Sequence, residues 1–95
     1  MENRIVEHLI RCAEKVAIKE KEYRTAKQDY ELLKAQYILC NNWEKILGKK
    51  KPTVAEKEAY IELETEVQRR RVNELRLEVE YCKRIYEINI MSQKY

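Results

Sequence analysis

The side chains that could carry out covalent or metal chemistry are few and widely spaced in this 95-residue chain. The three cysteines, Cys12, Cys40 and Cys82, form no CxxC or CxxH pair, and His8 is the only histidine. A zinc site would have to be assembled across helices from single ligands, which is a poor basis for metal binding. Ser92, the only serine, lies near the C-terminus. We expect no metal, no other cofactor, no small-molecule substrate and no enzymatic activity.

Clustered positive charge offers a different chemistry, the binding of anions. The formal net charge is +3, and the segments before and after "LGKKKPT" are nearly balanced, so the excess corresponds to Lys49, Lys50 and Lys51. We expect these lysines on an exposed tip, away from compensating carboxylates. They could contact phosphate groups, although a solvated turn is the simpler interpretation.

Trp43 lies close to this lysine segment, beside Asn41 and Asn42. A tryptophan here either caps the hydrophobic core or anchors a partner, because buried aromatic anchors dominate many interfaces. We predict that Trp43, Lys45 and Lys49 form a contact surface.

A second basic cluster, Arg69, Arg70 and Arg71, is expected within a helix. Three consecutive helical residues point about 100° apart, so they form no single patch. Glu66 and Glu74 each lie four residues from Arg70, at the spacing of intrahelical ion pairs. A solvated, salt-bridged surface explains most of the cluster, and an arginine that does bind a partner would take a carboxylate or a phosphate.

These residues need helices to position them, and the apolar pattern predicts two. Apolar residues recur at steps of four and three from Ile5 to Leu47, and again, less strictly, from Ile61 to Tyr86. This repeat is typical of coiled coils and long bundles. The composition agrees, because 39% of the residues are charged, 44% are hydrophobic and only one is glycine.

The segment between the two patterns has the chemistry of a tight connection. Gly48 fits a left-handed helix end, Pro52 cannot continue a helix, and Thr53 with Glu56 matches a capping box that starts the next one. Two helices joined so closely must fold back as antiparallel neighbours. We therefore predict an all-α fold, a coiled-coil-like helical hairpin about 65 Å long. Its single domain, residues 1–95, would comprise a helix over 3–47, a turn over 48–53 and a helix over 54–93.

Apolar residues at the end of the hairpin opposite the turn exceed what one neighbouring helix can cover. We expect this end to pack against another chain, most simply as a symmetric dimer that forms a four-helix bundle. A different protein would satisfy the same surface. The predicted interface comprises Ile5, Leu9, Ile10, Val16, Leu77, Tyr81, Ile85 and Ile88.

Three cysteines without a signal peptide indicate reduced thiols and a cytoplasmic location. The longest uncharged run, Ala35 to Trp43, is far shorter than the roughly 20 residues that a membrane span requires. We expect no membrane association.

The plan of the whole chain, with "GKKKPTVAEKEAYIELETE" and "YCKRIYEI", resembles a loose group of small helical-hairpin proteins encoded by bacteriophages. Most members of the group have no assigned biochemical role. The resemblance implies a setting in the host cytoplasm, where small phage early proteins often bind host or phage proteins and inhibit host defences. It carries no functional residue over to this chain.

Three functional hypotheses follow. The leading one is a non-enzymatic interaction protein, a dimeric hairpin that docks on another protein and, in the phage setting, modulates it. The second is a nucleic-acid-binding accessory of replication or recombination, which would use the lysine tip and Arg69 to Arg71. The third is a structural spacer or scaffold.

Overall fold

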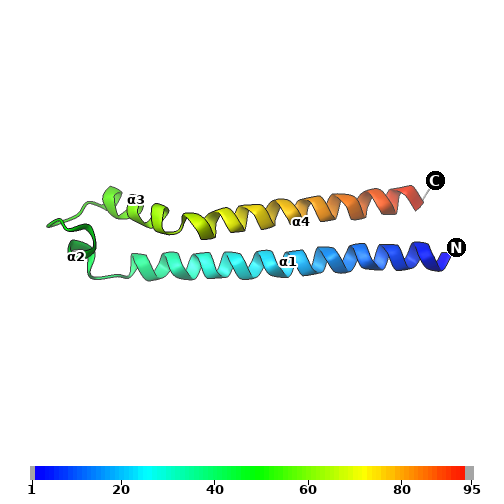
Figure 1. The fold of residues 1–95 in the computed structure, drawn as a ribbon, viewed down its shortest axis with the longest axis horizontal. Helices are drawn as coiled ribbons and strands as arrows, with labels where there is room; N and C mark the ends of the chain where they lie inside the picture. The colour runs from blue at the N-terminus through cyan, green and yellow to red at the C-terminus, as the bar shows by residue number, and fades with distance from the viewer. Residues whose placement is uncertain (1, 94–95) are drawn as a thin grey trace.

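The computed structural model describes residues 2–93, which form an antiparallel hairpin of helices without a strand (Figure 1). The molecule is a rod of 71 × 17 × 14 Å, and both ends of the described chain lie at the end opposite the turn. The helices are α1 (Glu2–Ile38), α2 (Trp43–Leu47), α3 (Val54–Glu64) and α4 (Glu66–Gln93).

The seam between α1 and α4 confirms the predicted packing of two long helices. Leu75, Val79 and Cys82 of α4 are buried, with Leu75 only 2% exposed. Burying such a side chain contributes roughly 1.5–3 kcal/mol. On α1, the half-buried positions follow the predicted steps of four and three: Leu9, Cys12, Val16, Lys19, Tyr23, Ala26, Tyr30, Leu33 and Tyr37.

Two ion pairs join the long helices and agree with a single antiparallel register. The Lys19 ammonium lies 3.1 Å from a Glu78 carboxylate oxygen, and the Lys83 ammonium lies 3.0 Å from Glu20. The hydrogen bond to Glu78, and then the one to Glu22, raises the pKa of Lys19. The four side chains keep 28–52% of their surface exposed to solvent, so these pairs select the register more than they stabilise the fold.

The first predicted helix is interrupted, because α1 ends at Ile38 instead of continuing to residue 47. Asn41 and Asn42 lie in the break, and asparagine favours turns over helix interiors. The break also changes which side chain faces inward. Trp43 is 7% exposed, whereas Glu44, which would continue the seam in an unbroken helix, is exposed. The chain thus buries an indole instead of a carboxylate.

The second predicted helix is also interrupted, at Thr65, between α3 and α4. Thr65 is fully buried at a seam position, and its hydroxyl donates a 2.6 Å hydrogen bond to the carbonyl oxygen of Ile61. A threonine bonded back to the preceding turn often bends a helix. In Figure 1, α3 departs from the line of α4, and α2 lies beyond the end of α1, at the tip of the hairpin.

An aromatic cluster fills this widened tip. The Tyr60 ring meets the Tyr37 ring at 5.8 Å and the Trp43 ring at 5.7 Å, both edge to face. Such pairs contribute about 0.5–1.5 kcal/mol beyond the burial of their area. Desolvation is the main reason that the pKa of Tyr60 is raised. The tip therefore has a small core of its own, next to the long seam.

We expect Leu75→Ala to lower the free energy of unfolding by about 2–4 kcal/mol, because it removes a fully buried side chain from the seam. The matched control is Leu32→Ala on α1, where the side chain is 61% exposed and the change should stay within about 0.5 kcal/mol. Urea denaturation at one fixed protein concentration measures both. Equal losses in the two variants would contradict the observed seam.

Candidate functional site

The turn that positions the predicted lysines has the helix end and the helix start that the sequence predicts. Gly48 adopts a left-handed conformation (φ 63°) at the end of α2, and its N–H donates to the carbonyl oxygen of Glu44. The capping box at the start of α3 is complete, since Thr53 and Glu56 exchange their side-chain and backbone hydrogen bonds. The sequence predicted both features.

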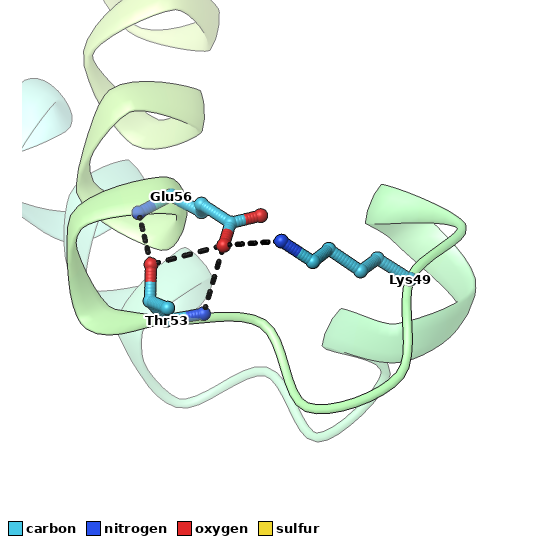
Figure 2. A network of polar contacts seen from close by, with 3 residues as sticks. All are labelled: Lys49, Thr53 and Glu56. Carbon is cyan, nitrogen blue, oxygen red and sulfur yellow. Dashed lines mark hydrogen bonds and ion pairs between the residues drawn. The ribbon is translucent and has the colours of Figure 1, made fainter.

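Lys49 is compensated by a carboxylate, contrary to expectation. Its ammonium lies 2.9 Å from Oε1 of Glu56, the same oxygen that accepts from the Thr53 hydroxyl (Figure 2). Lys49, and then the Thr53 hydroxyl, lowers the pKa of Glu56. Lys49 therefore stabilises the capping box, while Lys50 and Lys51 make no ion pair within the part of the chain that the structure describes.

An open cleft of about 580 Å³ lies beside this turn and gathers basic residues that the sequence alone did not group. Lys45 of α2, Lys51 of the turn and Lys57 of α3 all line it. Asn41, Asn42 and one carboxylate, Glu44, also line it. We call it the lysine cleft.

Trp43 is buried instead of forming an exposed contact surface with Lys45 and Lys49. It packs on Tyr60 and forms part of the wall of the lysine cleft. The Lys57 ammonium lies 5.9 Å from the centroid of the Trp43 ring, within the range of a cation–π interaction. Trp43 therefore forms the wall against which the Lys57 side chain lies. Lys57 itself was not among the residues predicted from the sequence. The one available signal was the position of Lys57 in the first turn of a helix that begins beside the lysine segment.

A second cleft of about 650 Å³ runs between the end of α1 and α3. Its buried residues are Trp43, Ile61 and Thr65. Basic and acidic side chains alternate around it: Lys34, Lys57 and Arg69 against Glu58 and Glu62. This cleft shows no consistent charge preference.

The predicted pairing of Arg70 with Glu66 is confirmed, whereas Glu74 pairs with Arg71 instead of Arg70. Arg70 pairs with Glu66 at 2.6 Å, and Arg71 lies 3.6 Å from Glu74. Arg69 instead lines the second cleft. The three arginines therefore form no common binding patch.

The predicted oligomer interface divides into two groups. Leu9 and Val16 are half-buried in the seam, where they face α4 of the same chain. Leu77 and Tyr81 follow the buried residues Leu75 and Val79 by two positions, about 200° around the helix, so they face away from α1. The exposed members are Ile5 (39%), Ile10 (50%), Leu77 (57%), Tyr81 (66%), Ile85 (36%) and Ile88 (53%), and Met91 (60%) extends the α4 row.

Cys12 lies near His8, the only histidine of the sequence, and near Asn89 of α4. Its sulfur lies 3.8 Å from Nε2 of His8 and 3.7 Å from Nδ2 of Asn89 across the seam. No cluster of three or more potential metal ligands occurs in residues 2–93. No described helix is long and apolar enough to cross a membrane.

We expect acid to destabilise the tip through Glu56. A carboxyl group whose pKa is lowered on folding contributes stability above its unfolded value of 4.5, and this contribution is lost as the pH falls through the folded pKa. Glu56→Gln should therefore lower the free energy of unfolding near pH 7 and reduce its change between pH 7 and pH 3. The control is Glu31→Gln, at an exposed position of α1. Urea unfolding at both pH values makes the comparison, and parallel pH profiles for wild type and Glu56→Gln would refute the prediction.

No protein-family model, no curated protein and no solved structure matches this chain, so its candidate functions rest on its own residues and their geometry.

Proposed function

We propose that this chain is a non-enzymatic protein-docking module that forms a homodimer through the outer face of α4. The observation that carries the proposal is the row of Leu77, Tyr81, Ile85, Ile88 and Met91, each at least 36% exposed. Single exposed apolar residues are ordinary on protein surfaces. A continuous row along four turns of one helix is a surface that another helix can cover.

A second copy of the chain fits this row better than an unrelated partner for two reasons. The row is straight and lies on one long helix, so two such rows can pack along each other about a twofold axis. Glu80 and Arg84 lie beside the row, and neither makes an ion pair within residues 2–93. An antiparallel pair of α4 helices with its axis near residue 82 brings Glu80 of each chain close to Arg84 of the other.

In the dimer proposed here, the two α4 helices pack against each other between the two α1 helices as a layer of four, in place of the closed four-helix bundle expected from the sequence, with one turn region projecting at each end. This arrangement presents the tip surface twice, and a protein partner would be bound there. The clefts at the tip are open, and no hydrogen bond among the described residues links Cys40, the one thiol that lines them, to a base. These features support a binding role over a catalytic one.

We expect the wild-type protein to have twice the 11.6 kDa mass of the single chain at about 50 µM, measured by light scattering after gel filtration. Ile88→Glu should yield a monomer, because it places a charge in the proposed interface. The matched control is Leu32→Glu, which alters a side chain of similar exposure (61% against 53%) on α1 and should leave the dimer intact. A monomeric wild type, or dissociation by both variants, would exclude this interface.

A further inference from the structure

The lysine cleft collects positive charge without neutralising it. Its three lysines come from α2, the turn and α3, so the fold itself brings them together. None of them forms an ion pair within residues 2–93, although Lys49, on the same turn, does. Glu44 is the one carboxylate that lines the cleft. The excess of three lysines over one carboxylate gives the lining a net positive charge, which would attract an anion.

Lys51 provides a second and independent observation. Its backbone is left-handed, with φ 54°, and it is the one non-glycine residue with positive φ among the described residues. This conformation is unfavourable for a residue with a Cβ, and glycine adopts it readily. The turn nevertheless has a lysine at this position, and that lysine lines the cleft. Strained residues of this kind are concentrated at binding sites.

We propose that the lysine cleft binds the phosphodiester backbone of single-stranded nucleic acid, a function beyond the dimerisation through α4 and the protein docking proposed for the tip. Lysine ammonium groups are point charges suited to phosphate, and the side-chain amides of Asn41 and Asn42 add donors to the same cleft. The one indole there, Trp43, is buried, so it offers no face on which a base could stack. Binding through the backbone alone is therefore independent of base sequence.

The shape of the tip favours a single strand over a duplex. The rod is 17 × 14 Å in cross-section, wider than the major groove of about 12 Å. A hairpin end of this width cannot enter the groove as a single recognition helix does. A single strand can cross an open cleft, because its phosphates are accessible from every side.

The test is fluorescence anisotropy with a fluorescein-labelled 20-nucleotide oligothymidine at 50 and 200 mM NaCl. Three phosphate contacts predict that wild-type affinity falls about 20-fold between these concentrations, from a slope of about −0.7 per contact on a single strand. The triple variant Lys45→Gln, Lys51→Gln, Lys57→Gln should bind at least tenfold more weakly at 50 mM and lose most of this salt dependence.

The matched control is Lys15→Gln, Lys21→Gln, Lys27→Gln. It removes the same charge from exposed positions of α1 that make no ion pair among the described residues. This variant should bind within about twofold of wild type. Equal losses in the two triple variants, or no wild-type binding at 50 mM NaCl, would overturn the proposal. The proposal would also be overturned if poly-glutamate with the same charge as the oligonucleotide displaced the label as well as unlabelled oligonucleotide does. Binding of pyrophosphate in calorimetry, without binding of the oligonucleotide, would overturn it too.

Lys51→Gly tests the same site without a risk to the fold, because glycine suits the left-handed backbone. The variant should unfold at the same urea concentration as wild type or a higher one, while its salt slope falls by about 0.7. Unchanged binding would remove Lys51 from the site and contradict the proposal. Light scattering on the same samples separates this result from the dimer, since the proposed interface is on the C-terminal part of α4, which runs toward the end of the rod opposite the turn.

Discussion

A hairpin of two helices has one internal interface, and every other feature of this molecule depends on that seam. Each helix can bury one stripe against its neighbour, and no second layer covers the remaining faces. The consequence is visible in α1, whose described side chains are at most half-buried. The fully buried side chains of the seam belong to α4 and to Thr65. The stability of the hairpin is therefore a sum of modest contributions along the seam, and Leu75, the one buried leucine among the described residues, carries a large share of it.

At the tip the two helices no longer run side by side, because a seam continued to this point would bury a charged side chain. An unbroken first helix would direct Glu44 into the seam, and an unpaired carboxylate is expensive to bury. The break after Ile38 replaces Glu44 with Trp43, and the bend at Thr65 moves α3 aside to admit the indole. The two interruptions are thus complementary. The clefts exist because the helices no longer run side by side there.

Much of the fold could be predicted from the sequence, because periodic apolar spacing and turn chemistry are local signals. The half-buried positions of α1, the left-handed Gly48 and the capping box of Thr53 and Glu56 all follow from such signals. The breaks could not be predicted in the same way. The apolar spacing continues through Cys40 and Thr65, and the low helix propensity of two asparagines is a weak signal beside it.

The site was less predictable than the fold, because it depends on contacts between elements. Lys49 and Glu56 are seven residues apart and meet only because of the path that the turn follows. Lys57 joins Lys45 and Lys51 through the placement of α2 against α3. Burial of Trp43 likewise depends on the two breaks acting together. Adjacency in sequence suggested the three turn lysines, whereas the cleft contains only Lys51 of these, together with Lys45 and Lys57.

The length of the rod separates its two ends electrostatically. At physiological ionic strength, charges are screened over about 8 Å, whereas the molecule extends 71 Å. An anion at the lysine cleft would leave the field around residues 77–91 of the same chain almost unchanged. Substitutions at the two ends should therefore act additively, as they do in molecules whose sites share no contacts.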